Sequence, residues 1–469
     1  MATIDTRPPL AAGALQELRD AVRGEVLAPG DPGYDAARPL WNAMFDDVRP
    51  ALIVRCAGAA DVMRAVELAR SEDLEIAVRA GGHSLPGFST ADGGLVIDLA
   101  PMRGVRVDPV RREALAQPGL LWQDFDRETQ AFGLAATGGL VSTTGVAGFT
   151  LGGGIGWLVR KQGLAGDHLV AADVVTADGR LVRAGRDGDP ELLWGLRGGG
   201  GNFGVVTALE LALQPVGPIV TGGLVFFAGD RAEEIVRFYS EWTAAGLPDE
   251  LTTLLNLTTA PPAPFLPEAV HGKPIVAVAA CYAGSPDAAE RALAPLRGLG
   301  DPVADLLGPI PYVALQGLLD PLWARGARNH MKAGYLDDFG DGAVDTLLRG
   351  WRAKPSPMSE LHVHHLGGAA AREPAGGASF AHRGAPYVVN FISRWTDGDE
   401  DDEQIAWGRD VYASMQEFTT GGAYVNFQGD EGQDGVRAAY GDDAYARLQA
   451  LKRTYDPENA FRRNQNVRP

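Results

Sequence analysis

A glycine turn that leads directly into a histidine is the segment of this chain with the clearest chemical potential. Residues 79–89 read Arg-Ala-Gly-Gly-His-Ser-Leu-Pro-Gly-Phe-Ser. Gly81 and Gly82 lack a Cβ and accept positive φ, so successive backbone N–H groups can converge on an anionic group such as a pyrophosphate. Arg79 would add a positive charge and Ser84 a hydroxyl. An isolated Gly-Gly-His is more often an ordinary turn, so its interpretation depends on the rest of the chain.

Five further segments carry distinctive residues. Residues 138–156 contain eight glycines, which imply close backbone approach to something flat or anionic. Residues 163–179 and 190–206 are also rich in glycine, and the C-terminal part contains Tyr-Val-Asn-Phe at 424–427 and a polar segment at 455–467. With the histidine turn, these segments resemble those of the berberine bridge enzyme-like FAD-linked oxidases, within the vanillyl alcohol oxidase and para-cresol methylhydroxylase (PCMH) superfamily.

This resemblance implies a covalently bound FAD. In the family, the histidine that matches His83 bonds to the 8α-methyl of the isoalloxazine, and the block 138–156 lies along the isoalloxazine and its diphosphate. Many members carry in this block a cysteine linked to the flavin 6-position, and Val141 stands at the matching position here. We therefore expect FAD attached through His83 only. Val146 falls near the family's oxygen-gating position, where a small side chain fits an oxidase.

The resemblance also implies the residues of the site. The expected cofactor-binding residues are Arg79, Ala80, Gly81, Gly82, His83, Ser84, Ser89, Gly119, Gly139, Val141, Thr143, Thr144, Gly145, Gly148, Gly152, Gly153, Val175, Asn426 and Asn464. Tyr424 is the expected catalytic residue, because the tyrosine of this motif lies over the flavin in family members and often deprotonates an alcohol. A free phenol has a pKa of about 10, so this role requires hydrogen bonds or a nearby cation that lower it.

A histidine-rich segment offers further candidates. In His362-Val-His364-His365, strand alternation places His362 and His364 on one face and His365 on the other. We find no cysteine or carboxylate spaced to complete a metal site, so we expect no metal and predict that one histidine, His365, lines the substrate cavity. Tyr387 and Asn390 either line the same cavity or pack within a strand. His365 and Tyr387 join Tyr424 as candidate catalytic residues.

A competing motif lies at Gly199-Gly-Gly-Asn-Phe-Gly204, which satisfies the G-x-G-x-x-G fingerprint of nicotinamide dinucleotide binding. That fingerprint requires a strand before it and a helix after it. Here a helix-like Glu-Leu-Leu-Trp run precedes, and the strand-like residues 204–213 follow. We therefore do not expect a nicotinamide site.

Composition limits the partners. Forty-two Lys and Arg against 60 Asp and Glu give a formal charge of −18, which opposes binding to nucleic acid or an anionic membrane surface. The first ten residues lack the features of a secretory signal, and no stretch reaches the roughly 20 apolar residues of a membrane-spanning helix. Only Cys56 and Cys281 occur, which excludes a disulfide framework. We expect a cytoplasmic protein whose oligomeric state is open.

The order of apolar periodicities predicts an α+β fold. Helices are expected at residues 11–23, 59–70 and 122–132, with strands at 52–55, 74–79, 95–99, 105–107 and 115–117. We expect a PCMH-type FAD-binding domain at 1–215 and a substrate domain at 216–425, in which helices cover one face of an antiparallel sheet. Residues 426–469 are expected to return and close the flavin site.

These inferences favour an oxidase that passes a hydride from a small molecule to flavin, with O2 reoxidising the flavin to give H2O2. A sugar, a secondary-metabolite alcohol and an amine all remain open as substrates, because the same scaffold serves many reactions. A dehydrogenase with another electron acceptor is one alternative. A flavin-binding protein without turnover is the other.

Overall fold

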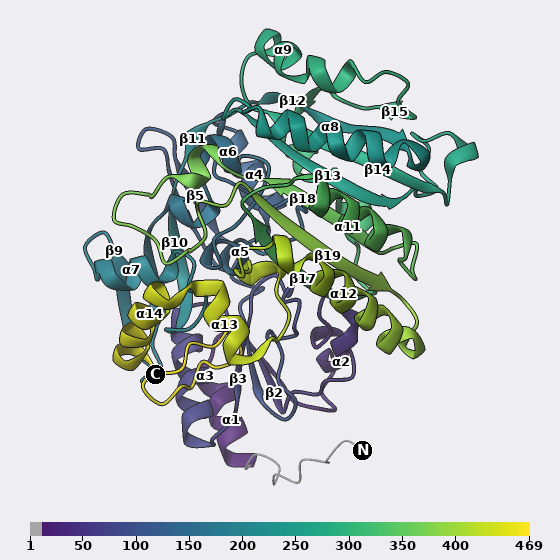
Figure 1. The fold of residues 1–469 in the computed structure, drawn as a ribbon. Helices are drawn as coiled ribbons and strands as arrows, with labels where there is room; N and C mark the ends of the chain where they lie inside the picture. The colour runs from purple at the N-terminus through teal and green to yellow at the C-terminus, as the bar shows by residue number, and fades with distance from the viewer. Residues whose placement is uncertain (1–11) are drawn as a thin grey trace.

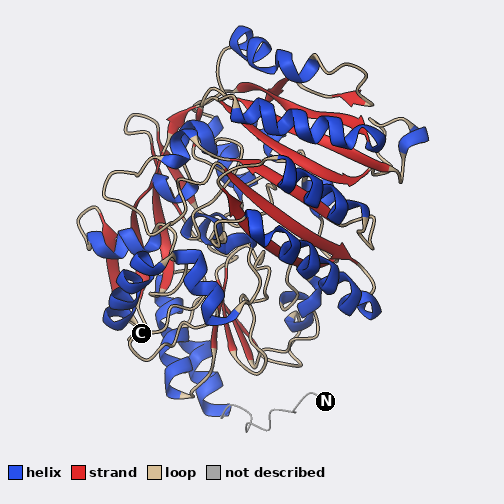
Figure 2. Cartoon of the chain, viewed as in Figure 1, coloured by secondary structure: helices blue, strands red, loops and turns tan. Residues whose placement is uncertain are grey.

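The structure, a computed structural model, describes residues 12–469. The first helix, α1, spans Ala12–Ala21, so residue 11 of the expected helix and the residues assessed for a signal sequence lie outside the described part. The expected α+β class is confirmed. The chain forms three main sheets, with the helices distributed around them (Figures 1 and 2).

A small four-stranded sheet positions the histidine turn. Its order is β1-β2-β4-β3, and β4 pairs parallel with both neighbours; the strands are β1 (Glu25–Leu27), β2 (Leu52–Arg55), β3 (Ile76–Arg79) and β4 (Leu95–Asp98). Helix α3 (Ala59–Ser71) buries Val62, Val66 and Ala69 against it, which confirms the predicted helical spacing. Because β3 ends at Arg79, the chain enters the Gly81–Gly82 turn directly from the edge of the sheet.

A five-stranded antiparallel sheet follows, in the order β5-β6-β10-β8-β9. Its strands are β5 (Val105–Asp108), β6 (Glu113–Ala116), β8 (Leu169–Val175), β9 (Leu181–Gly185) and β10 (Val205–Ala212). The helices of this part are α2 (Tyr34–Ala37), α4 (Trp122–Gln130), α5 (Val146–Leu151), α6 (Val159–Gln162) and α7 (Pro190–Leu196). A two-stranded pair of β7 (Leu134–Ala135) and β11 (Gln214–Pro215) links it to the next sheet.

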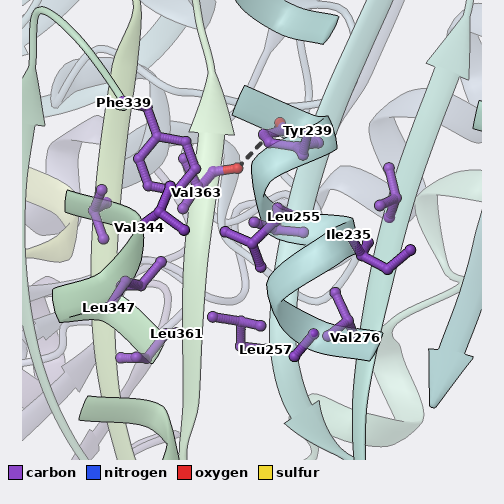
Figure 3. Close-up of a cluster of buried hydrophobic side chains, with 14 of the residues drawn as sticks. Ile235, Tyr239, Leu255, Leu257, Val276, Phe339, Val344, Leu347, Leu361 and Val363 are labelled. Carbon is purple, nitrogen blue, oxygen red and sulfur yellow. Dashed lines mark hydrogen bonds between the residues drawn. The ribbon is translucent and has the colours of Figure 1, made fainter. Parts of the chain in front are cut away.

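The third sheet has eight antiparallel strands. They are β12 (Ile219–Ala228), β13 (Leu251–Thr259), β14 (Pro274–Tyr282), β15 (Ala304–Asp305), β16 (Gly308–Pro311), β17 (Arg328–Leu336), β18 (Glu360–His365) and β19 (Tyr387–Trp395). Helices α8 (Ala232–Ala244), α9 (Pro286–Arg297), α11 (Asp341–Arg352) and α12 (Asp401–Met415) pack on one face (Figure 2). Figure 3 shows the apolar cluster between α8, α11 and that face. The opposite face is free of these helices and turns toward the first two sheets.

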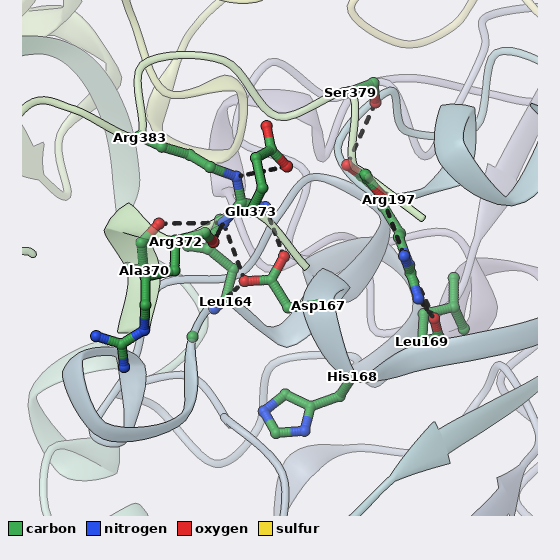
Figure 4. A network of polar contacts seen from close by, with 12 residues as sticks. Leu164, Asp167, His168, Leu169, Arg197, Ala370, Arg372, Glu373, Ser379 and Arg383 are labelled. Carbon is green, nitrogen blue, oxygen red and sulfur yellow. Dashed lines mark hydrogen bonds and ion pairs between the residues drawn. The ribbon is translucent and has the colours of Figure 1, made fainter. Parts of the chain in front are cut away.

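The C-terminal segment returns to the first half of the chain. It contains α13 (Gly432–Tyr440) and α14 (Asp442–Tyr455), and α14 packs on α7 (Figure 1). A second link joins residues 372–383 to the 3-10 helix that follows α6 (Ala165–His168): the Arg383 guanidinium forms a two-pronged ion pair with Asp167, with Nη2–Oδ1 at 2.5 Å and Nη1–Oδ2 at 3.0 Å (Figure 4). The third sheet is therefore fixed to the first half of the chain by polar contacts as well as by packing.

A buried carboxyl group lies where α4 meets α10 (Tyr312–Gln316). Asp126 is fully buried, and neither of its carboxyl oxygens has a hydrogen-bond partner among the described residues. Burial raises the pKa of Asp126 well above its usual value. The folded state therefore holds this proton more tightly than the unfolded state, so the Asp126 contribution to stability falls as the pH rises through the folded-state pKa.

Asp126→Asn removes this ionisation, so the unfolding free energy of the variant should fall less than that of wild type as the pH rises. We expect the variant to gain unfolding free energy relative to wild type as the pH increases from 5 to 8, by about 1–3 kcal/mol at the upper end. Urea unfolding of both proteins at pH 5 and pH 8 measures the difference. An equal difference in unfolding free energy between the two proteins at pH 5 and pH 8 would contradict the raised pKa of Asp126.

Candidate functional site

Three segments far apart in sequence meet at one place, and glycine makes the contacts possible. A Cβ on Gly81 would lie 2.4 Å from the Gly145 backbone nitrogen, so the histidine turn and the block 138–156 touch backbone to backbone. A Cβ on Gly152 would lie 2.1 Å from the Asn426 side chain, which brings the Tyr-Val-Asn-Phe motif against the same block. No other residue type fits these positions without displacing backbone or the Asn426 amide.

A cavity of about 390 Å³ runs between these segments and beneath the face of the third sheet that lies opposite α8, α9, α11 and α12. Most of the expected cofactor-binding residues line it: Ala80, Gly81, Gly82, His83, Ser84, Ser89, Gly139, Val141, Thr144, Gly145, Gly148, Gly152, Asn426 and Asn464. Tyr424 lines it as well. The structure thus brings together residues from all three segments that the sequence singled out.

Five expected cofactor-binding residues do not line this cavity. Arg79 was expected to face a pyrophosphate, and that prediction is wrong: its guanidinium is buried and pairs with Asp98, with Nη2–Oδ2 at 2.8 Å and Nε–Oδ1 at 3.2 Å. Gly119 and Thr143 line a second cavity on the other side of the His83 turn, together with Arg79. Gly153 packs against Phe380, and Val175 is buried in β8.

Many further lining residues were not predicted from the sequence. Among them are Trp41, Phe88, Gly200, Gly201, Asn202, Tyr440, Phe461, Arg463 and Gln465. Gly200 and Gly201 belong to the rejected nicotinamide motif, and the expected context is confirmed, with helix α7 before it and strand β10 after it. That glycine run could have been assigned to the same site, since it also allows close backbone approach.

His83 is held between an aromatic ring and a hydroxyl group. Its imidazole stacks on Trp41 with ring centroids 5.2 Å apart and planes inclined by 14°. Its Nε2 lies 3.2 Å from Thr143 Oγ1, whereas Nδ1 has no hydrogen-bond partner among the described residues. Burial, with a smaller effect from the nearby Arg325 guanidinium, lowers the pKa of His83 to about 4. The ring is therefore neutral at neutral pH and keeps a nitrogen lone pair available.

No cysteine lines the cavity. Val141 is in its wall, while Cys56 and Cys281 are buried in separate apolar clusters. Val146, which the resemblance places near the oxygen-gating position, does not line the cavity: its side chain is fully buried in the core around the five-stranded sheet. From the same block, Thr144 lines the cavity instead.

Tyr424 contacts the block 138–156 through its phenol oxygen. This oxygen accepts hydrogen bonds from the Gly154 N–H at 3.0 Å, the Ile155 N–H at 3.1 Å and the Asn426 amide at 2.9 Å. Burial nevertheless raises the pKa of Tyr424 to about 12, despite the opposing effect of these donors. The condition for a proton-accepting role, a lowered pKa, is not met. The geometry instead makes Tyr424 an anchor for the Gly154 loop.

The cavity continues beneath β18 and β19. His362 and His364 line it together with Asn390, which is the cross-strand partner of His362. The predicted alternation is confirmed, but the choice of His365 is wrong. His365 and Tyr387 lie on the opposite face, where their rings are 5.4 Å apart and the Tyr387 hydroxyl contacts Thr243 of α8 at 2.8 Å. Neither residue touches the cavity.

The cavity walls suit a large, flat, partly polar group such as FAD. A Cβ on Gly148 or Gly201 would meet nothing within 4 Å, so both glycines face open space along the wall. Asn464 Oδ1 and Arg463 Nε are buried in the wall without hydrogen-bond partners, and they can serve a polar ligand. Within residues 12–469, no cluster of three His, Cys, Asp or Glu side chains could hold a metal ion.

Comparison with known proteins agrees with this geometry. The FAD binding domain family matches residues 50–185, and the berberine and berberine-like family matches residues 423–468. The chain is 33% identical to (R)-6-hydroxynicotine oxidase of Paenarthrobacter nicotinovorans over 96% of this chain and 97% of that protein. It is 30% identical to an FAD-linked oxidoreductase of Dictyostelium discoideum over 98% of each.

Solved structures show the same fold. The crystal structure of 6-hydroxy-D-nicotine oxidase from Arthrobacter nicotinovorans superposes with a TM-score of 0.86 at 30% identity, covering 96% of this chain and 98% of that one. A Physcomitrella patens berberine bridge enzyme-like protein gives a TM-score of 0.86 at 20% identity, covering 97% and 99%. Fold and site define an FAD-dependent oxidoreductase. The chain belongs to the berberine bridge enzyme-like FAD-linked oxidases of the PCMH superfamily.

None of the helices in the described residues is both long enough and apolar enough to span a bilayer.

Proposed function

We propose that this protein is an oxidase whose FAD is attached through His83 alone, and that it oxidises a small molecule and reduces O2 to H2O2. The observation that carries the proposal is the neutral His83 imidazole at the junction of the glycine segments. A neutral imidazole can form a bond to carbon, whereas an imidazolium has no free lone pair. The flavin, when bound, supplies the hydride-accepting chemistry.

The wall around His83 supports a single tether. Trp41 and Thr143 fix the orientation of the imidazole, and Nδ1 is left free to form the bond. Val141 occupies the wall where the bicovalent members of the family have their cysteine, and a valine cannot form a second link. Both cysteines of the chain lie away from the cavity.

The electron acceptor is part of the proposal. One structural neighbour, Phl p 4, is a glucose dehydrogenase in its wild-type form and a glucose oxidase in a variant, so this fold serves both acceptors. For the present chain, we favour O2 because (R)-6-hydroxynicotine oxidase, to which the chain is 33% identical over 96% of its length, is an oxidase. The cavity wall contributes a small Thr144 from the glycine block, which leaves space beside the flavin.

A test without substrate separates the two acceptors. The purified holoprotein is reduced with dithionite, freed of excess reductant, and mixed with air-saturated buffer. An oxidase restores the oxidised flavin spectrum within seconds and releases one H2O2 for each flavin. Reoxidation that takes many minutes, with fast reoxidation by a quinone or dye, would establish a dehydrogenase.

Tyr424→Phe tests whether this phenol anchors the loop or accepts a proton. The variant leaves two buried N–H groups and the Asn426 amide without their acceptor, so we expect a loss of about 1–3 kcal/mol in unfolding free energy. The rate of flavin reduction should fall less than tenfold. A fall of about 10²–10⁴-fold with unchanged stability would restore the role of general base to Tyr424.

A further inference from the structure

The cavity beneath the third sheet has walls of rings with almost no charge. A continuous series of ring contacts runs from the tether to the C-terminal motif: Trp41 to Trp323 at 6.1 Å, Trp323 to His362 at 6.1 Å, His362 to His364 at 5.8 Å and His364 to Phe427 at 5.3 Å. Among the described residues that line the cavity, none is an Asp, Glu or Lys, and Arg463 is the single Arg.

That arginine is partly engaged, and of its guanidinium nitrogens only Nε is buried without a hydrogen-bond partner among the described residues. Its Nη2 donates to the carbonyls of Thr90 at 2.8 Å and Gly87 at 3.1 Å, and its guanidinium lies over the Phe88 ring. A second cation, Arg394, lies behind the rings, 4.9 Å from the centroid of Trp323. A charged ligand would therefore lose its hydration without meeting an opposite charge in the wall, a large cost in free energy.

One hydrogen-bonded group of polar side chains interrupts this apolar surface. The Glu360 carboxylate accepts a hydrogen bond from His362 Nε2 at 2.7 Å and from the Asn256 amide at 2.8 Å. Burial alone would raise the pKa of Glu360, but these two hydrogen bonds lower it overall, so the group is ionised at neutral pH. Nε2 of His362 is thus engaged by a carboxylate, whereas Nδ1 has no partner among the described residues and in a neutral imidazole carries the free lone pair.

Two more polar atoms lie next to this nitrogen. His364 Nε2 and Asn390 Oδ1 are buried without hydrogen-bond partners, and both residues line the cavity. Burial, reinforced by the neighbouring His362, lowers the pKa of His364 well below its usual value, so it is a neutral donor or acceptor. Since buried polar atoms are rarely left unpaired, these two atoms can orient a hydroxyl group beside His362.

We propose that His362 is the catalytic base, that Glu360 is its positioning residue, and that the substrate is an uncharged alcohol on a planar, conjugated body. This proposal rests on the proposed flavin-dependent oxidation. The O–H proton passes to Nδ1 of His362, the hydrogen on the carbinol carbon leaves with its electron pair to the oxidised flavin, and the C–O bond becomes C=O. Each turnover thus removes two electrons and two hydrogens from the alcohol.

Binding can be measured without turnover. The probes are 2-phenylpropan-2-ol, which has no carbinol hydrogen, and its amine and carboxylate counterparts, which carry opposite charges on nearly the same shape. Titration calorimetry of the holoenzyme should show the alcohol binding at least about tenfold more tightly than either ion. His362→Gln should weaken it about tenfold, and His365→Gln, on the opposite face, should not. Absent alcohol binding, or preference for either ion, would overturn the substrate class.

Anaerobic flavin reduction by benzyl alcohol tests the base. We expect His362→Gln to slow it about 10²–10⁴-fold, with His365→Gln at the wild-type rate. Glu360→Gln removes the acceptor that holds Nε2 of His362, so it should slow flavin reduction more than it weakens the binding of 2-phenylpropan-2-ol.

A rate of flavin reduction within threefold of wild type in either His362→Gln or Glu360→Gln would overturn the assignment. Retention of acid-stable flavin and of the visible spectrum shows that each variant is folded. Dithionite reduction followed by air reports on the oxidase proposal separately, because it needs neither substrate nor base. Rapid reoxidation with no oxidation of benzyl alcohol would therefore reject this inference alone.

Discussion

His83→Ala should abolish the covalent attachment of flavin. In wild type, the yellow colour should stay with the protein after acid precipitation, whereas in the variant acid should release all of it. The physical reason is that the only nucleophile placed for the bond is removed: within residues 12–469, the cavity wall has one histidine in the glycine segments and no cysteine. Intact-protein mass spectrometry gives the same answer, as loss of the mass of FAD.

The same variant should affect redox chemistry without destroying the site. The glycine contacts between Gly81 and Gly145 do not involve the imidazole, so FAD should still bind reversibly. We expect a lower flavin reduction potential in the variant, because the histidyl link raises this potential in members of the family. His365→Gln, outside the cavity, is the matched control and should keep all its flavin through acid treatment. Acid-releasable flavin in wild type would contradict a histidyl link altogether.

The parts of the site that could be predicted from sequence are the glycine segments, where the backbone itself forms the contacts. Clustered glycines indicate positive φ or close approach of backbone to another group. The turn at Gly81 and the block 138–156 therefore predict a ligand-binding wall from the sequence alone. The pattern of strand and helix periods also indicated the α+β class. In each case, the signal lies within a few neighbouring residues.

Side-chain roles were harder to predict because they depend on partners distant in sequence. Arg79 stands at the start of the predicted turn, but Asp98, at the end of the next strand β4, forms an ion pair with its guanidinium. For His365, alternation gave two faces correctly and no information on which one faces the cavity. Glu360 was overlooked as a carboxylate near the histidines, although it lies two residues before His362, the spacing that places both on one strand face.

The closing segment 455–467 depends on a buried ion pair, and breaking it should have the largest effect on stability. The Lys452 ammonium and the Asp456 carboxylate are both fully buried, with Nζ–Oδ2 at 2.7 Å. Lys452 also donates to the carbonyls of Asn202 at 2.8 Å and Phe461 at 2.9 Å. Asp456 accepts from the backbone N–H groups of Ala460 and Phe461. The pair therefore joins α14, the Gly199–Gly204 loop and the cavity-lining segment.

Asp456→Asn should cost about 3–5 kcal/mol in unfolding free energy, because it leaves a buried ammonium without its anion. Burial already lowers the pKa of Lys452 despite the carboxylate, and losing the carboxylate should lower it further. The folded variant then holds fewer protons than the unfolded chain, so the deficit should shrink as the pH rises from neutrality toward about 10.

Urea unfolding of wild type, Asp456→Asn and the double variant Lys452→Met/Asp456→Asn at pH 7 and pH 9.5 tests this. The double variant should recover part of the loss at pH 7, since no charge remains to be buried, and its deficit should not depend on pH. Because Phe461, Asn464 and Gln465 line the cavity, the single variant should also release non-covalent FAD faster in the His83→Ala background. A deficit for Asp456→Asn that stays constant from pH 7 to 9.5 would show that Lys452 keeps its proton in the folded variant, and would contradict the lowered pKa.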